Sequence, residues 1–212
     1  APSIPRVTGI CEGAKEDKSG WSAFLRHLVD RGLKGVELII SDACRGLVES
    51  AAEYMPDARW QRCVVHFYRN VFSHVPASKV REVSHMLKAI HAQETRATAE
   101  AKASSVVDEL RRQRMGRAAD LVDAHVAETL TYYAFPDCHW IKIRTNNPLE
   151  RIMREIRRRT RVVGAFPDGQ SCLNLAAARL RHIAGTQWST RKYMNMAPLR
   201  AAETEAYGAA TA

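Results

Sequence analysis

Two acidic residues stand where they could share a metal ion. Asp42 follows the β-branched run 36–40, and Glu150 begins an arginine-rich segment much later in the chain. A carboxylate just beyond a buried strand projects over the carboxyl edge of a sheet, where open α/β sheets bind ligands. Carboxylate oxygens are also the donors that Mg²⁺ prefers. The two residues therefore predict part of a magnesium site that acts on phosphodiesters.

Each carboxylate also has a purely structural interpretation. Ser41 or Asp42 could N-cap the helix that follows. Asn147 could N-cap a later helix with Pro148 in its first position, and Glu150 would then close a capping box with Asn147. One Glu150 oxygen could contact the backbone while the other faces a metal, so both interpretations stay open.

Basic residues crowd around Glu150. Between Lys142 and Arg161 they outnumber the acids Glu150 and Glu155. A guanidinium group suits phosphate oxygens, and phosphate neutralisation dominates nucleic-acid affinity. A charge run can also be a solvated helix face, but the scarcity of balancing acids favours phosphate contact. The expected contact residues are Arg144, Arg151, Arg154, Arg157, Arg158, Arg159 and Arg161.

Composition agrees with a polyanionic partner. The chain has 212 residues with a net charge of +9, and 46% of its residues are hydrophobic, enough for a substantial core. Its five cysteines are scattered without a CxxC pair, which predicts a protein of the reduced cytosol.

Several classes of protein are disfavoured by features that the sequence lacks. No apolar run is long enough to cross a bilayer. A glycine-rich phosphate loop and a nucleophile elbow are also missing, which argues against nucleotide-binding proteins and serine or cysteine hydrolases.

Cysteine and histidine pairs offer a weaker alternative. Cys63 and His66 have a spacing that could supply two metal ligands, and Cys138 with His139 could supply another pair. A structural zinc needs four ligands, and the second pair has no regular spacing. We therefore expect Cys63 and His66 to pack beneath the site rather than to bind zinc.

The elements that must position these residues follow from periodicity. Strands are expected at 6–11, 36–40 and 60–65. Helices are expected at 19–31, ending at Gly32, and around 47–54, ending at Pro56. This alternation is typical of a parallel or mixed α/β sheet. From 77 to 134 strand signals vanish and three helices are expected as an insertion, and helices return at 148–160 and 170–183.

Three stretches, 32–47, 60–70 and 145–167, resemble the bacterial Mutator-like insertion-sequence transposases in content and order. The resemblance covers roughly residues 5 to 198. It implies a ribonuclease-H-like core with an all-helical insertion, and an Asp, Asp, Glu trio that holds Mg²⁺ or Mn²⁺. Asp42 matches the second Asp, Glu150 matches the Glu, and Cys63 and His66 match a Cys-x-x-His signature near the second Asp.

The resemblance also implies a difference from the intact enzymes. In the family the first Asp lies on an opening strand ahead of the stretch resembling 7–12, and this chain begins after it. Glu12, Glu16 and Asp17 fall where the family has a turn. We therefore expect a C-terminal piece that cleaves little DNA alone. The alternative is a non-catalytic nucleic-acid-binding remnant that acts through the arginine-rich helix.

The expected fold is an incomplete ribonuclease-H-like α/β core, helix-rich overall. Its expected parts are a partial core at 1–72, a helical insertion at 73–139, a return to the core at 140–198 and a disordered tail at 199–212. The resemblance implies that the intact enzyme acts on insertion-sequence ends and target DNA, as a homo-oligomer, in the bacterial cytoplasm near the nucleoid.

Overall fold

The computed structural model describes residues 7–11, 13, 17–186, 193–201 and 204. It divides the chain into two compact units. Unit 1 comprises Ala1–Val36, Arg45–Pro56 and Asn146–Ala212, and unit 2 comprises Glu37–Cys44 and Asp57–Thr145. The expected boundaries between core, insertion and return stay a prediction, and most of the expected tail at 199–212 lies outside the described residues.

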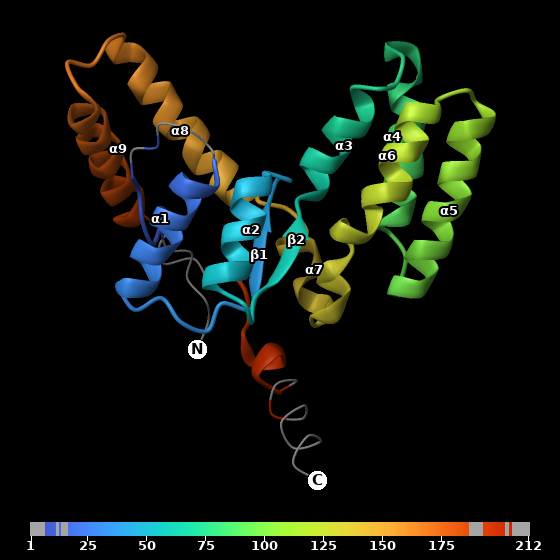
Figure 1. Cartoon of the computed structure of the whole chain (residues 1–212), viewed down its shortest axis with the longest axis horizontal. Coiled ribbons are helices and arrows are strands. Elements are labelled where there is room, and N and C mark those ends of the chain that lie inside the picture. The colour runs from blue at the N-terminus through green and yellow to red at the C-terminus, as the bar shows by residue number, and fades with distance from the viewer. Residues whose placement is uncertain (1–6, 12, 14–16, 187–192, 202–203, 205–212) are drawn as a thin grey trace. The chain divides into compact units, whose positions relative to one another are not determined.

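Unit 2 holds a small parallel sheet. Strand β1 (Leu38–Ser41) pairs with β2 (Arg59–Arg62) from Leu38 opposite Arg59 to Ser41 opposite Arg62 (Figure 1). The apolar run expected to form a strand at 36–40 thus forms β1. Parallel pairing brings the carboxyl ends of both strands to one edge, so the residues that follow Ser41 and Arg62 emerge close together.

The strand expected at 60–65 is too long. Chain direction changes at Cys63, and helix α3 (Val64–Phe72) begins at the next residue. Val64, Phe67 and Val71 recur at helical spacing and are all buried. Burial of this stripe favours a helix over continuation of the strand, although β-branched residues occupy 64 and 65.

Helices make up the rest of unit 2, and the apolar spacing over 77–134 correctly predicts three of them: α4 (Val80–Ile90), α5 (Arg96–Arg112) and α6 (Gly116–His125). Leu87, Leu110 and Val122 contribute fully buried side chains, one from each helix. Thr95 begins α5 with a capping box to Thr98. The connecting elements are η1 (Ala77–Lys79), η2 (Val126–Thr129), η3 (Thr131–Ala134), η4 (Asp137–His139) and α7 (Trp140–Ile143).

A buried amide joins β2 to this helical region. The Gln61 side chain is 0% exposed. Its Nε2 donates to the carbonyl oxygen of Thr129 at 2.8 Å, and its Oε1 accepts from the backbone N–H of Tyr132 at 2.9 Å. Both backbone groups would otherwise be buried without partners, so Gln61 holds η2 and η3 in register with the sheet.

Unit 1 contains α1 (Lys18–Asp30) and α2 (Arg45–Tyr54), at the expected positions. Gly46 permits their close approach, because a Cβ there would stand 2.6 Å from the backbone nitrogen of Lys18. The hydroxyls of Ser22 and Ser50 are 2.9 Å apart across the contact. After α1 the chain turns at Gly32, whose φ of +92° suits the expected C-terminal glycine.

The strand expected at 6–11 is wrong for residues 7–11, which have no regular secondary structure; Arg6 lies outside the described residues. The carbonyl oxygen of Thr8 accepts from the Arg31 guanidinium at 3.1 Å. A Cβ at Gly9 would stand 2.8 Å from Leu28, so this segment packs directly on α1. Thr8 and Gly9 therefore contact α1 and Arg31 rather than a neighbouring strand, and a glycine weakens a strand at this position.

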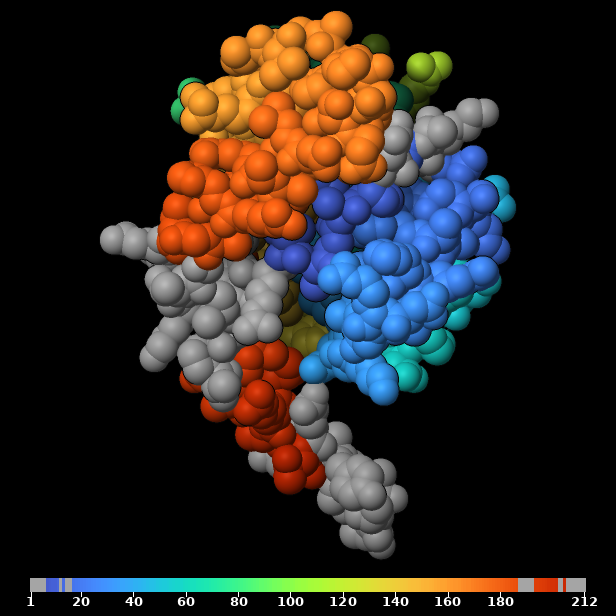
Figure 2. All heavy atoms as spheres, turned by 90° about the vertical axis from the view of Figure 1, so that its left-hand side faces the viewer, coloured from blue at the N-terminus to red at the C-terminus, as the bar shows by residue number. Residues whose placement is uncertain are grey.

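Helices α8 (Asn147–Val163) and α9 (Gly169–Ala184) form the other pair of unit 1. Figure 2 shows their atoms, in orange, as one continuous surface of that unit. Asp168 caps α9 by accepting from the Ser171 N–H at 2.6 Å. The chain is thus helix-rich with a small parallel sheet, which agrees with the α/β prediction. Within the described residues, the helices all fall short of the length and apolar character that a membrane span requires.

Candidate metal and nucleic-acid site

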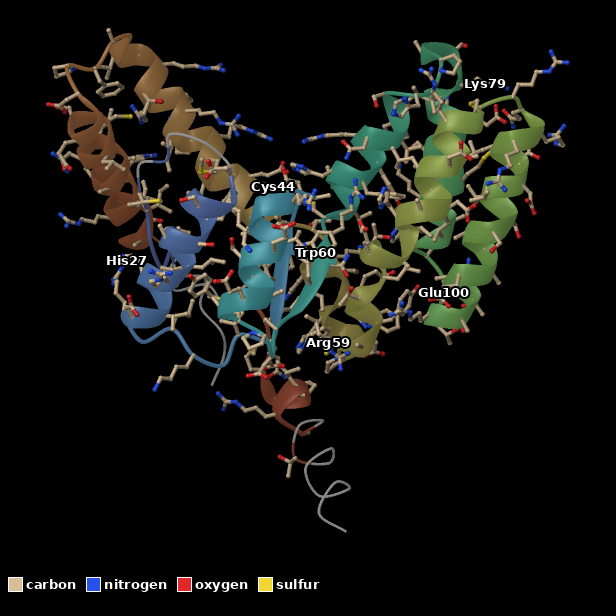
Figure 3. The ribbon with its side chains drawn as sticks, viewed as in Figure 1. His27, Cys44, Arg59, Trp60, Lys79 and Glu100 are labelled. Carbon is tan, nitrogen blue, oxygen red and sulfur yellow. The ribbon has the colours of Figure 1, made fainter. Side chains whose placement is uncertain are left out.

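Asp42 lies directly beyond β1, at the carboxyl edge of the sheet. Trp60 lies on β2 (Figure 3). Its indole N–H donates to the Ser41 hydroxyl at 2.9 Å, and that hydroxyl donates to the Asp42 carbonyl oxygen at 2.7 Å. The Cys63 N–H donates to the Ser41 carbonyl oxygen at 2.7 Å. Hydrogen bonds from both strands therefore fix the backbone that carries the Asp42 carboxylate.

His66 stands beside this carboxylate. Its Nδ1 lies 3.8 Å from Asp42 Oδ2, and the two side chains are 27% and 51% exposed. Cys63, one turn earlier, is 0% exposed and precedes the first residue of α3. The burial of Cys63 agrees with the expectation that it packs beneath the carboxyl edge of the sheet. His66 was expected to pack there too, but it lies beside the Asp42 carboxylate.

The capping interpretation of Ser41 and Asp42 does not fit this local structure. Helix α2 begins at Arg45, so the residue in the N-cap position is Cys44. The Ser41 hydroxyl is engaged between Trp60 and the Asp42 carbonyl. Neither residue therefore N-caps α2, and the Asp42 carboxylate lies beside His66 instead.

Glu150 lies in the first turn of α8, as expected, but the start of the helix differs by one residue. Asn146 occupies the N-cap position without a side-chain capping bond, and Asn147 is already helical. The Glu150 backbone N–H donates to the Asn146 carbonyl oxygen at 3.1 Å. The alternative interpretation, a capping box between Glu150 and Asn147, is therefore wrong, because Asn147 lies inside the helix and not at its N-cap.

The two candidate ligands belong to different units, Asp42 to unit 2 and Glu150 to unit 1. Within the described ranges, no three His, Cys, Asp or Glu side chains gather as a metal site. A shared ion at Asp42 and Glu150 thus stays a prediction.

Arg144 has a structural role within unit 2. Its guanidinium donates to the carbonyl oxygen of His91 at 3.1 Å, and its own carbonyl accepts from the Val64 N–H at 3.0 Å. These bonds hold the segment after α7 against α3 and the end of α4. Contact of Arg144 with phosphate stays a prediction.

The arginines of α8 divide into two groups. Glu155 binds Arg158 at 3.0 Å, Arg159 at 3.5 Å and also Arg179 of α9. Arg151, Arg154, Arg157 and Arg161 lie along the same helix outside this set of ion pairs, and all six arginines of α8 are exposed. Sequence reasoning noted Glu155 only as a charge, although its spacing of three and four residues from Arg158 and Arg159 predicts such pairs.

The chain resembles known transposases over most of its length. A family model described as "Transposase, Mutator family" matches residues 6–190. The transposase for insertion sequence element ISRM5 of Rhizobium meliloti is 37% identical over 92% of this chain and 49% of the relative. The transposase for IS1081 of Mycobacterium tuberculosis is 37% identical over 92% and 47%. The transposase for IS256 in transposon Tn4001 of Staphylococcus aureus is 30% identical over 89% and 49%. The chain thus spans about half the length of these relatives.

Proposed function

Because the chain belongs to the Mutator family of transposases, we propose that Asp42 and Glu150 supply two metal-binding carboxylates of an enzyme that cleaves and rejoins DNA at insertion-sequence ends. The observation that carries this proposal is the position of Asp42. It follows β1 at the carboxyl edge of a parallel strand pair, on backbone held by Trp60, Ser41 and Cys63. In this proposal β1 and β2 belong to a ribonuclease-H-like sheet.

The donor chemistry fits magnesium or manganese. Both candidate ligands are carboxylates, and hard oxygen donors suit these ions. A bound ion would activate the attacking oxygen and stabilise the leaving oxygen of a phosphodiester. Asp42 and Glu150 would hold the ion, with His66 beside Asp42 to orient its carboxylate. The exposed arginines of α8 would bind the phosphate backbone.

Metal binding by the purified chain tests the carboxylate assignment. Mn²⁺ binding is followed by electron paramagnetic resonance. We expect Asp42→Asn and Glu150→Gln each to lower the Mn²⁺ affinity by roughly tenfold or more, because the loss of a residue that only contacts a metal ligand already lowers metal affinity by about that factor. If both residues share one ion, the double variant should be little worse than either single variant. Asp57→Asn, which changes an exposed acid in unit 2, is the matched control.

The outcomes separate the two residues. Unchanged Mn²⁺ affinity in both single variants would refute the metal site. Loss of one of two bound ions in each single variant, with the other ion still bound, would mean that Asp42 and Glu150 bind separate ions.

A second function, non-catalytic adhesion to nucleic acid, is favoured by the exposed arginines of α8 alone. The two functions differ in what they require. Adhesion weakens steeply with salt and requires neither Mg²⁺ nor Glu150, whereas cleavage requires both. Nicking of supercoiled plasmid by the purified chain, in Mg²⁺ and in chelator, discriminates them. Nicking lost in Glu150→Gln supports the enzyme and overturns the expectation that this chain alone is inactive.

A further inference from the structure

One face of α8 carries Glu150 together with three arginines. Arg154, Arg157 and Arg161 follow Glu150 at intervals of four, three and four residues. At 3.6 residues per turn this spacing keeps all four side chains on one face of the helix. All three arginines are exposed, and Ile152, on the opposite side, is buried. We call Arg154, Arg157 and Arg161 the phosphate face.

Glu155 gathers a different set of arginines. Its carboxylate accepts from Arg158 Nε and Nη2 at 3.1 and 3.0 Å, and it also binds Arg159 and Arg179. The hydrogen bonds from Arg158, followed by the charge of Arg158 and the contact with Arg179, lower the pKa of Glu155 to about 2. Since Arg179 belongs to α9, this cluster also fastens α8 to α9. We call these four residues the Glu155 cluster.

We propose that the phosphate face binds successive phosphates of one DNA strand leading to Glu150, while Glu155 keeps Arg158 and Arg159 from contacting DNA. This inference rests on the proposed function and specifies how that site holds its substrate. It divides the arginines of α8 into DNA-binding and helix-pairing residues, although the sequence presents them as one charge run.

The dimensions of the helix agree with this arrangement. Arg154 and Arg161 are separated by about 10 Å along the axis, at about 1.5 Å per residue. A duplex advances about 3.4 Å per phosphate along each strand, so this distance spans about three phosphate-to-phosphate steps of a strand that runs along the helix. Three arginines on one face can therefore each meet a phosphate of the same strand.

The salt dependence of DNA binding tests the division. A fluorescein-labelled random-sequence duplex is titrated with the full chain across a range of salt concentrations, and the slope of log Kobs against log[salt] is measured. Arg154→Gln, Arg157→Gln and Arg161→Gln should each flatten the slope by about 1, and the triple variant by about 3. Arg158→Gln and Arg159→Gln are matched controls on the same helix and should leave the slope unchanged.

Glu155→Gln distinguishes the proposed role of Glu155 from a purely structural one, because a purely structural role would lower the thermal midpoint without changing the salt slope. Removal of its charge frees Arg158 and Arg159, so the slope should become steeper by about 1 to 2 while the thermal midpoint falls. Arg179→Gln should lower the midpoint without steepening the slope, because Arg158 and Arg159 keep Glu155 as a partner.

Three results would overturn the inference. Equal flattening by Arg158→Gln and Arg154→Gln would show diffuse charge rather than a phosphate face. An unchanged slope in Glu155→Gln would show that Glu155 does not withhold its arginines. A wild-type chain without salt-dependent binding would refute DNA contact by α8 altogether, and would leave the Mn²⁺ assignment of Asp42 and Glu150 to its own test.

Discussion

The Trp60 indole N–H reaches across the sheet and donates a 2.9 Å hydrogen bond to the Ser41 hydroxyl, one residue before Asp42. The same hydroxyl donates to the Asp42 carbonyl oxygen at 2.7 Å. The two strands are thus joined by a side-chain hydrogen bond at the end of their backbone pairing, where Ser41 lies opposite Arg62. An aromatic residue on β2 therefore helps to fix the backbone that carries an acid beyond β1.

We expect Trp60→Phe to loosen this edge without unfolding the protein. Loss of the indole donor removes one hydrogen bond, which costs about 1 kcal/mol of unfolding free energy. If Asp42 binds metal, Mn²⁺ affinity should also fall by up to about tenfold, because an outer-shell partner is lost. Urea denaturation and Mn²⁺ titration measure the two effects. Ser41→Ala removes the acceptor, and the double variant should cost less than the sum of the two single variants.

Gln61→Leu should lower the free energy of unfolding strongly, although the two side chains are similar in size. The substitution leaves the Thr129 carbonyl and the Tyr132 N–H buried without their partner. Each orphaned group costs about 1 to 3 kcal/mol, so unfolding free energy should drop by about 3 kcal/mol in urea denaturation. Gln93→Leu, in the same unit, loses a single bond to the Ala89 carbonyl and should cost about 1 kcal/mol. Equal losses would contradict the role of Gln61 as the link to η2 and η3.

His91 should make unit 2 sensitive to acid. Burial, opposed by the Leu87 carbonyl and aided by the charge of Arg144, lowers the pKa of His91 to about 4 from an ordinary 6.5. The unfolded chain therefore binds the proton first, and this stabilisation is complete above pH 6.5 and lost as pH falls toward 4. The loss amounts to about 3 kcal/mol. The measurement is urea denaturation at successive pH values, in which His91→Gln should flatten the decline between pH 6.5 and 4.

Local signals predicted the elements that glycine or proline delimits. Gly32 ends α1, Pro56 follows α2 and Pro148 lies in the first turn of α8, so each boundary is visible in the sequence. The start of α3 was missed because Val64 and Val65 favour a strand as much as a helix. The buried apolar stripe that favours a helix includes Phe67 and Val71, which lie beyond the expected strand.

Contacts distant in sequence explain the remaining differences. Residues 7–11 do not form a strand, because Arg31 donates to the Thr8 carbonyl and Gly9 packs on α1. Hydrophobic periodicity does not reveal such contacts. At the site, the position of Asp42 beyond β1 followed from its apolar run. The contact of Glu155 with both α8 and α9 could not be predicted from local sequence, because Arg179 lies 24 residues away from Glu155.

Arg62 and Glu128 should show that breaking a buried ion pair costs more than replacing it. Arg62 at the end of β2 is 5% exposed and lies 2.9 Å from the 33% exposed Glu128 carboxylate. Glu128→Leu leaves the Arg62 charge buried without its acid and should cost about 3 kcal/mol or more of unfolding free energy. In Arg62→Met with Glu128→Leu no buried charge remains, so the double variant should be more stable than Glu128→Leu alone. Urea denaturation of the wild type, both single variants and the double variant completes the cycle. A double variant less stable than Glu128→Leu would mean that Arg62 stabilises β2 mainly through its packing over the Phe67 ring, 5.6 Å from its guanidinium carbon.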